Sequence, residues 1–455
     1  MMKRLPEILA PAGDMTCLQA ALDAGADAVY LGLDTLNMRR LATRNFTRAS
    51  LPEASQRCRA RGVRLYLTLN TIIYEHELPE LEAALHDAAP LIDAAIVADW
   101  AAVEACKRHR VPIHISTQMS CSNSAAARFL KAQGASRIVL ARECTLKEIA
   151  EIARSAEIEI ETFVHGAICV AVSGRCLLSH DAYGCSSSRG ECHQPCRREF
   201  LIHEVREGDN ANAAFRVTPH TVLSARDLCS LPFVDQLVTA GVAALKIEGR
   251  ARNPEYVKAT VAAYRAAVSA VADGTFSPAL AERLTAACAA VYHREFGCGL
   301  FHGRPGAGQF TNTDENQATS KKLHVGIVLN YYPKARMVQI QIQDQPVALG
   351  DALAIHGPTT GVVELAVTAL RREDEVCTRA ERGTWVTLPC ESRVRINDKV
   401  FVVRAASAAY RTDTDRTVDA RPEERACRSH SIPVIALSST PRASPPDRPE
   451  APSRW

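Results

Sequence analysis

Short hydrophobic runs alternate with amphipathic, helix-like segments along the first two thirds of the chain. The runs that fit β-strands cover residues 7–13, 28–33, 64–70, 94–99, 112–118, 137–143, 158–165 and 242–248. Strands separated by single helices predict βαβ units and a parallel sheet, and eight such units close naturally into a barrel. A doubly wound sheet is the main alternative, because alternation alone does not require closure. We therefore expect an α/β fold with a TIM-like (β/α)8 barrel over residues 1–295.

Residues that favour helix ends support this alternation. Ser50 is a candidate N-cap before Pro52 and Glu53, which suit a first helical turn, and Gly62 is placed to end that helix. Residues 145–148, Thr-Leu-Lys-Glu, repeat the capping-box pattern. These signals predict helices in two of the segments that separate candidate strands.

An unusually long segment separates the seventh and eighth candidate strands. It covers residues 166–240 and is rich in Cys, Ser, Gly and Arg. Connections in α/β units are usually a few residues long, and long ones are usually functional. We therefore expect this cysteine-rich insertion to carry a function at the mouth of the barrel.

The pattern changes after the eighth candidate strand. Amphipathic helices are predicted at 254–273 and 277–292, and the Gly-rich, polar residues 296–321 suit a linker. Period-two alternation between turns then predicts a small β-barrel domain over residues 322–404. Residues 405–455 mix Arg with Asp and Glu and then become rich in Pro and Ser, which predicts a disordered tail.

Composition excludes several classes of protein. Of 455 residues, 47% are hydrophobic and 23% are charged, which is typical of a globular α/β protein. The formal net charge of +3 is too small to indicate a nucleic-acid partner by itself. The N-terminal residues lack the apolar stretch of a secretory signal, and the apolar runs are shorter than the roughly 18 residues that a membrane span needs. We expect a cytoplasmic protein with no membrane or DNA partner.

Five of the sixteen cysteines cluster in the insertion, at Cys169, Cys176, Cys185, Cys192 and Cys196. In a chain without a secretory signal, such thiols are better interpreted as metal ligands than as a disulfide framework. Buried cysteines that act only as small hydrophobic residues are the alternative. The spacing favours a four-thiolate site with Cys185 as the spare residue, but it does not distinguish zinc from an iron–sulfur cluster.

Several motifs together resemble peptidase family U32, also called the collagenase-like peptidases. The first is the stretch 161–179, ETFVHGAICVAVSGRCLLS, with its Gly-x-Cys-x-Leu-Ser ending. The others are Leu9-Ala-Pro-Ala-Gly-Asp14, Gly25-Ala-Asp-Ala-Val-Tyr-Leu-Gly32, Asn45-Phe46, Lys246-Ile-Glu-Gly-Arg250 and Tyr256. The resemblance extends across the whole predicted barrel.

The resemblance implies a cofactor and a reaction class. Members of the family include prephenate-dependent tRNA and ribosomal RNA hydroxylases and ubiquinone hydroxylation proteins, with a 4Fe-4S cluster held by cysteines. Matching the family's motifs to this chain gives Cys169, Cys176, Cys192 and Cys196 as the cluster ligands. For the fourth position, Cys185 or Cys229 is the alternative to Cys196.

Polar residues follow the predicted barrel strands, at the end where barrel active sites lie. They are Asn70, Asp99, Gln118, Arg142, Glu143, His165, Lys246, Glu248 and Arg250. Lys246 and Glu248 alternate with Ile247, so both point the same way, and with His165 they are the candidate catalytic residues. Arg142 or Arg250 can bind an anionic donor through a carboxylate, and Arg142, Arg197 and Arg250 are the candidate substrate-binding residues. Solvated surface charges or internal ion pairs are the alternative for each.

The favoured function is hydroxylation of RNA, most specifically formation of 5-hydroxyuridine at the wobble position of tRNA with a prephenate-like donor. The predicted β-domain favours this branch, because it is typical of the longer tRNA uridine hydroxylases. The alternatives are a U32-type peptidase using His165 beside Cys169, an RNA-binding protein with a structural metal site, and a hydroxylase of ribosomal RNA or a quinone precursor.

Overall fold

The computed structural model describes the chain from residue 5 to residue 406 with short gaps. The described ranges are residues 5–41, 44–198, 200–203, 214–217, 223–303, 309–311, 316–373 and 375–406. Nearly all of the predicted tail, 405–455, therefore lies outside the described residues.

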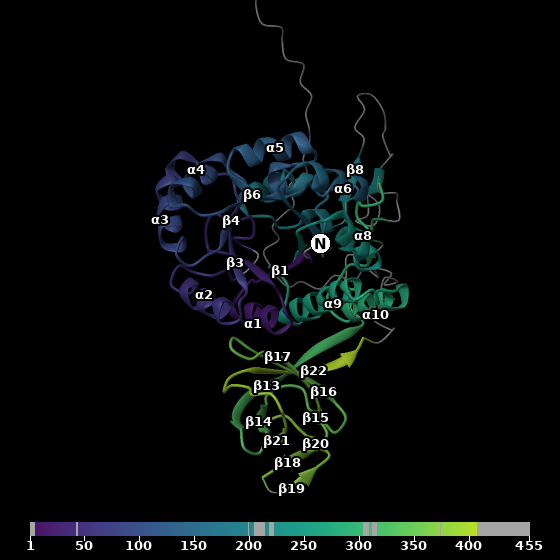
Figure 1. Cartoon of the computed structure of the whole chain (residues 1–455). Helices are drawn as coiled ribbons and strands as arrows, with labels where there is room; N and C mark the ends of the chain where they lie inside the picture. Colours follow the sequence, from purple (N-terminus) through teal and green to yellow (C-terminus); the bar gives the residue numbers. More distant parts are fainter. Residues whose placement is uncertain are drawn as a thin grey trace, which may run out of the picture. The chain divides into compact units, whose positions relative to one another are not determined.

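Eight parallel strands close into a barrel, as the alternating pattern predicts (Figure 1). They are β1 (Glu7–Pro11), β2 (Ala28–Gly32), β3 (Arg64–Leu69), β4 (Ala94–Val97), β5 (Ile113–Ile115), β6 (Ala135–Val139), β7 (Glu159–Gly166) and β11 (Ala244–Ile247). Strand β11 closes the barrel by pairing with both β1 and β7, with Lys246 opposite Leu9 on one side and Phe163 on the other. Closure excludes the doubly wound alternative.

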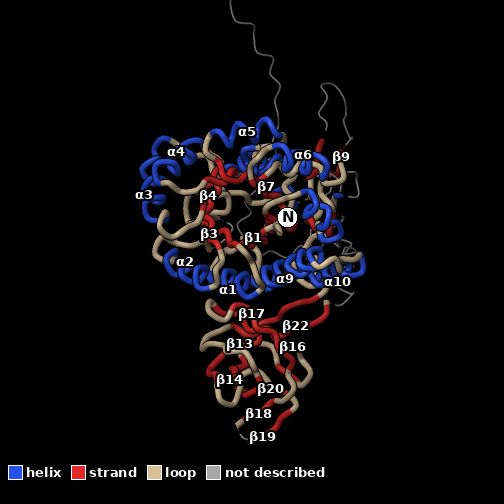
Figure 2. Tube along the Cα trace, viewed as in Figure 1, coloured by secondary structure: helices blue, strands red, loops and turns tan. Residues whose placement is uncertain are grey.

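Helices surround the strands, as Figure 2 shows in blue. They are α1 (Met15–Asp23), α2 (Leu51–Ala60), α3 (Leu78–Ala88), α4 (Trp100–His109), α5 (Ser124–Ala132), α6 (Leu146–Ser155), α8 (Val234–Ala240), α9 (Pro254–Ala272) and α10 (Pro278–Ala289). The capping box of α6 forms as predicted, because Glu148 N–H donates to Thr145 Oγ1 and Thr145 N–H donates to the Glu148 carboxylate. Ser50 occupies the predicted N-cap position of α2 and Pro52 lies in its first turn, but no side-chain capping hydrogen bond forms. The Ser50 hydroxyl donates to the carbonyl of Thr47 and makes no cap to the helix.

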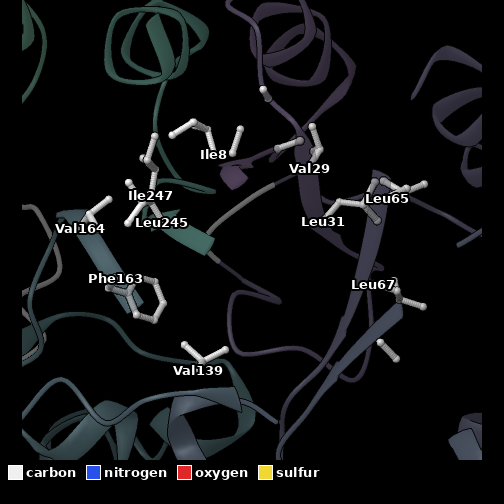
Figure 3. Close-up of a cluster of buried hydrophobic side chains, with 14 of the residues drawn as sticks. Ile8, Val29, Leu31, Leu65, Leu67, Val139, Phe163, Val164, Leu245 and Ile247 are labelled. Atoms are coloured by element: carbon white, nitrogen blue, oxygen red, sulfur yellow. The ribbon is translucent and has the colours of Figure 1, made fainter. Parts of the chain in front are cut away.

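The main hydrophobic core lies between the strands and the surrounding helices. Figure 3 shows members of this layer, including Ile8, Val29, Leu31 and Leu65. Each fully buried aliphatic side chain of this kind contributes roughly 1.5–3 kcal/mol of transfer free energy. Successive strand residues point to opposite faces, so the alternate positions face the inside of the barrel.

The inside of the barrel is partly polar. Its small apolar cluster consists of Leu9, Ala28, Tyr30, Tyr66, Ala94 and Ile96. Beside it lie four buried charged side chains, Glu7, Arg137, Glu161 and Lys246, each at most 5% exposed. Barrels of this type usually fill these positions with bulky branched residues, so the buried charges need a separate explanation.

The insertion leaves the barrel after β7 and returns through α8. Its described elements are α7 (Leu178–Tyr183), β8 (Phe200–His203), β9 (Ala214–Val217) and β10 (Asp227–Cys229), with short 3-10 turns between them. Strand β10 pairs antiparallel with the end of β7, and β12 (Phe296–Gly297) pairs parallel with β10. The barrel wall is thereby extended on the side where β7 ends.

An antiparallel, β-rich region follows the barrel. Its strands are β13 (Ser320–Tyr332), β14 (Met337–Ile342), β15 (Val347–Ala348), β16 (Ala352–Gly357), β17 (Gly361–Ala366), β18 (Leu370–Arg372), β19 (Glu375–Cys377), β20 (Arg379–Ala380), β21 (Trp385–Pro389) and β22 (Lys399–Ala405). Alternate residues of β14, Val338, Ile340 and Ile342, are fully buried in the core of this β-rich region.

Within the described residues, no helix has the length and apolar character needed to cross a membrane.

Candidate active site at the barrel mouth

A cavity of about 140 Å³ opens where the barrel strands end and the insertion begins. Strand ends and the loops that follow them contribute Tyr30, Arg39, Thr68, Asn70, Gln118, Arg142, Phe163, Lys246, Glu248 and Arg250. The insertion contributes Cys169, Cys176, Ser187, Cys192, Cys196 and Arg197. The cavity therefore unites most of the residues that the sequence singled out.

Lys246 and Glu248 both line the cavity, in agreement with their alternation around Ile247. Lys246 Nζ donates to Glu161 Oε1 at 2.8 Å and lies 4.6 Å from the centre of the Tyr30 ring. Burial lowers the pKa of the Lys246 ammonium, and the adjacent Glu161 carboxylate opposes that effect. The lysine is thus a buried cation with one carboxylate partner.

Glu248 lies among arginines. Its Oε1 accepts a hydrogen bond from Arg39 Nη2 at 3.0 Å, and its Oε2 lies 3.4 Å from the Tyr30 hydroxyl, which donates to it. Burial alone would raise the pKa of Glu248, but Arg39, Arg142 and Arg250 together lower it to about 2. Glu248 is therefore an ionised hydrogen-bond acceptor and a weak base at neutral pH.

Arg142 and Arg250 keep part of their hydrogen-bonding capacity for a ligand. The Arg142 guanidinium lies 3.9 Å from the Phe163 ring centre and donates to the carbonyl of Ala167 at 2.7 Å. Arg250 donates to Asn37 Oδ1 at 3.0 Å and to Thr68 Oγ1 at 2.9 Å, while its buried Nε has no partner among the described residues. Burial lowers the pKa of Arg250 to about 10, so it remains cationic at neutral pH.

Arg197 has its main contacts with the insertion's backbone. Its two terminal nitrogens donate to Ser224 Oγ at 2.7 Å, to the carbonyl of Ala225 at 2.9 Å and to the carbonyl of Ile168 at 2.7 Å. Ile168 lies at the start of the insertion, and Ala225 lies just before β10. Arg197 therefore links the outgoing and returning chain beside Cys196.

The four predicted metal ligands converge on the cavity. Cys169 is exposed, Cys176 and Cys192 are half-buried, and Cys196 is 9% exposed. Burial raises the pKa of the Cys196 thiol, Arg197 lowers it, and Cys169 and Cys192 raise it. The mutual effect of these thiols indicates that they lie near one another. Thiolates facing a common space with a neighbouring guanidinium fit an anionic metal–sulfur group.

Neither alternative fourth ligand lines this cavity. The Cys185 thiol donates to the carbonyl of Tyr183 at 3.4 Å, and Cys229 is buried in β10 within the barrel wall. Among the described residues, no group of three or more His, Cys, Asp and Glu side chains is close enough to hold a single metal ion.

His165 does not line the cavity. It is 1% exposed and packs against Tyr256, Tyr264 and Phe296, with ring centres 5.4–5.9 Å apart. Burial lowers its pKa to about 3, so it is neutral at physiological pH. The structure does not bring its imidazole into the space that Cys169 faces.

Two residues that shape the site, Glu161 and Arg39, were not predicted as catalytic residues from the sequence. Glu161 was noticed only as part of a family motif, yet it is fully buried and bonded to Lys246. Arg39 comes from the chain after β2 and pairs with Glu248. A charged residue alternating with hydrophobic positions in a buried strand was the available signal for Glu161, whereas Arg39 carried no such signal.

Positive charge predominates around the cavity. The cationic lining residues are Arg39, Arg142, Arg197, Lys246, Arg250 and Arg294, and the carboxylate among the lining residues is Glu248. Arg294 pairs with Asp227 at 3.2 Å, and Lys246 pairs with Glu161, so two of these positive charges are balanced by carboxylates that do not line the cavity. The remaining net positive charge of the cavity lining suits an anionic ligand.

Comparison with known proteins shows the family to which the chain belongs. Residues 13–311 match the family described as peptidase family U32. A protein named collagenase from Porphyromonas gingivalis is 34% identical over 407 residues, covering 87% of this chain and 97% of the relative. The tRNA hydroxylation protein P1 of Bacillus subtilis is 34% identical over 359 residues, covering 78% and 84%. The tRNA hydroxylation protein P of Escherichia coli is 27% identical over 441 residues, covering 81% and 96%.

The family match covers most of the barrel, including β7, the described parts of the insertion and β11. The collagenase relative extends the similarity beyond the barrel over nearly its whole length. On both grounds the chain belongs to peptidase family U32.

Proposed function

We propose that this protein is an iron–sulfur RNA hydroxylase that forms 5-hydroxyuridine at the wobble position of tRNA, with a prephenate-like hydroxyl donor. The observation that carries the proposal is the meeting of four cysteines and a cationic wall in one cavity at the barrel mouth. Relatives named tRNA hydroxylation proteins supply the reaction class.

Cys169, Cys176, Cys192 and Cys196 would hold a 4Fe-4S cluster. When bound, such a cluster supplies electron-transfer chemistry at a potential set by its surroundings. Arg197 contributes to those surroundings by fixing the chain next to Cys196. Its donors are committed to the insertion, so in this proposal it supports the cluster and does not bind RNA phosphate.

The remaining cavity residues bind the donor and move a proton. Arg142 and the partly unpaired Arg250 would bind a carboxylate of the donor through charge-assisted hydrogen bonds. Lys246 would donate a proton to an oxygen atom within the cavity, because it is a buried ammonium whose pKa is lowered. Glu248 would orient Arg39 and the other arginines, since a carboxylate with so low a pKa accepts protons poorly.

An RNA substrate fits the position of the site. Sequence-specific recognition of RNA mostly involves single-stranded loops with unstacked bases, as in an anticodon loop. A base entering the mouth would meet Phe163 and the amides of Asn70 and Gln118, all of which line the cavity. Aromatic and amide groups are the side chains that stack on and hydrogen-bond to such bases.

Peptidase activity is the rival suggested by the family name and the collagenase relative. A cysteine peptidase requires a histidine within hydrogen-bond reach of the nucleophile. His165, the sequence candidate, lies outside the cavity that Cys169 lines. The geometry therefore favours hydroxylation.

The test is to delete the gene and to measure 5-hydroxyuridine and its derivatives in tRNA nucleosides by mass spectrometry. We expect these nucleosides to disappear and to return when the wild-type gene is supplied. Complementation with Cys169→Ser or Lys246→Ala should fail, whereas Cys185→Ser should succeed because Cys185 does not line the cavity. Unchanged hydroxyuridine in a deletion strain without a second homologue would refute the tRNA assignment.

A further inference from the structure

A continuous chain of ion pairs runs through the barrel interior from Lys246. Glu161 accepts from Lys246 Nζ through Oε1 at 2.8 Å, and its Oε2 lies 3.4 Å from Arg137 Nη1. Arg137 pairs in turn with Glu7 at 2.9 Å and with Glu159 at 2.7 Å. The chain of pairs therefore joins the cavity to Glu159, whose side chain is 40% exposed.

The buried ion pairs in this series carry a desolvation cost. The side chain of Glu161 is 0% exposed and that of Arg137 is 2% exposed. Buried ion pairs often stabilise a fold less than well-packed apolar side chains of the same size would. The usual branched apolar residues of a barrel interior would therefore serve stability at least as well. A role in the site explains the charges better.

We infer that Glu161 is a positioning residue for Lys246: its carboxylate holds the ammonium in the cavity wall and keeps it charged, so that the cavity presents a cation to an anionic ligand. Arg137 forms an ion pair with Glu161 from the other side. The inference rests on the proposed function only in that an anionic donor binds in this cavity.

The groups around Lys246 support this division of roles. Tyr30 from β2 faces it with its ring, and Glu248 and Arg250 face it from the end of β11 with opposite charges. His114 from β5 lies within electrostatic reach and is a neutral imidazole, because burial lowers its pKa well below the ordinary value. Glu161 is the group that hydrogen-bonds to the ammonium and is therefore its principal counter-ion.

The experiment measures the protonation of Lys246 directly. The full-length protein is trace-labelled with acetic anhydride across a range of pH, and labelling of Lys246 is quantified by peptide mass spectrometry. Only the neutral amine reacts, so the labelling profile reports the pKa of Lys246. In Glu161→Gln we expect the midpoint to fall by roughly one pH unit or more, with about tenfold faster labelling at neutral pH.

The matched control is Glu159→Gln. This variant also removes a carboxylate of β7 that pairs with Arg137, but it leaves the ion pair between Lys246 and Glu161 intact. Its Lys246 profile should match the wild type. Glu161→Asp, which keeps the charge on a shorter side chain, should shift the midpoint in the same direction by less and serves if the glutamine variant does not fold. Profiles in Glu161→Gln or Glu161→Asp that equal the wild type, or an equal shift in Glu159→Gln, would overturn the inference. Labelling requires neither RNA nor donor, so this result is independent of the nucleoside measurement.

Discussion

Single side chains in this protein differ sharply in protonation because burial and neighbouring charges act on them in different combinations. Glu248 stays ionised because three arginines outweigh the effect of its burial. His165 stays neutral because no neighbouring charge outweighs the effect of its burial. Lys246 lies between these cases, with burial and Glu161 in opposition. The environment of each group, more than its residue type, sets what it can do in the site.

The cysteines provide a prediction at this scale. Serine substitution of Cys169, Cys176, Cys192 or Cys196 should abolish stoichiometric iron binding, because each lines the cavity and an alcohol is a poor ligand for iron–sulfur clusters. Cys185→Ser and Cys229→Ser are matched controls that should retain iron. Iron and zinc are quantified in protein purified without oxygen. Stoichiometric zinc without iron in the wild type would contradict the cluster assignment.

His165 provides a second prediction, concerning pH. Its pKa is about 3 in the folded protein against an ordinary value of 6.5. Between these values the unfolded chain binds a proton that the folded chain does not, so acidification lowers the free energy of unfolding by about 1.4 kcal/mol per pH unit for this group. Replacing it in His165→Phe should reduce the slope of stability against pH below 6.5. Urea unfolding at several pH values measures the slope, and an unchanged slope in His165→Phe would contradict the prediction.

At the scale of elements, the sequence placed all eight barrel strands but not every boundary. Strand β6 begins at Ala135, two residues before the expected start, because its pairing with β5 extends to Ala135 opposite Ile113. In the β-rich region, the alternating stretch 362–370 is divided into β17 and β18, which pair with different partners. Hydrophobic alternation locates a strand, but its ends depend on neighbours that are distant in sequence.

One side chain, Arg197, forms several hydrogen bonds within the insertion. Arg197→Met should remove three hydrogen bonds to Ile168, Ser224 and Ala225, each worth roughly 1.5–3 kcal/mol for a charged donor, and should loosen the cysteine-bearing segment. We expect faster cleavage within residues 167–198 by proteases other than trypsin, and weaker iron retention. The melting temperature of the barrel should change little. Arg175→Met, which removes one exposed contact to Gln118, is the control. Equal protease resistance in both variants would show that Arg197 does not fix the insertion.

At the scale of the whole molecule, the described residues contain two large hydrophobic cores, besides the small cluster inside the barrel. One fills the space between barrel strands and helices, and the other lies inside the β-rich region. Both are complete by Val402, so the chain has buried its described apolar clusters before the Pro- and Ser-rich C-terminal residues begin.

Truncation tests this division. Deleting residues after 428 should leave the melting temperature and the RNA hydroxylation unchanged, because that segment's composition offers little apolar surface to bury. Thermal unfolding and nucleoside analysis of the truncated protein are the measurements. A fall in melting temperature of several degrees would show that the segment packs against the rest of the chain.

The sequence by itself determined the alternation of strands and helices, the cysteine-rich insertion, and the sharing of one face by Lys246 and Glu248, because these depend on local periodicity and spacing. Only the tertiary structure decided which groups meet. It united the four cysteines in one cavity, placed Glu161 behind Lys246, brought Arg39 to Glu248, and separated His165 from Cys169. Closure of the barrel brings residues from opposite ends of the chain within hydrogen-bond distance, and no local pattern in the sequence records those distances.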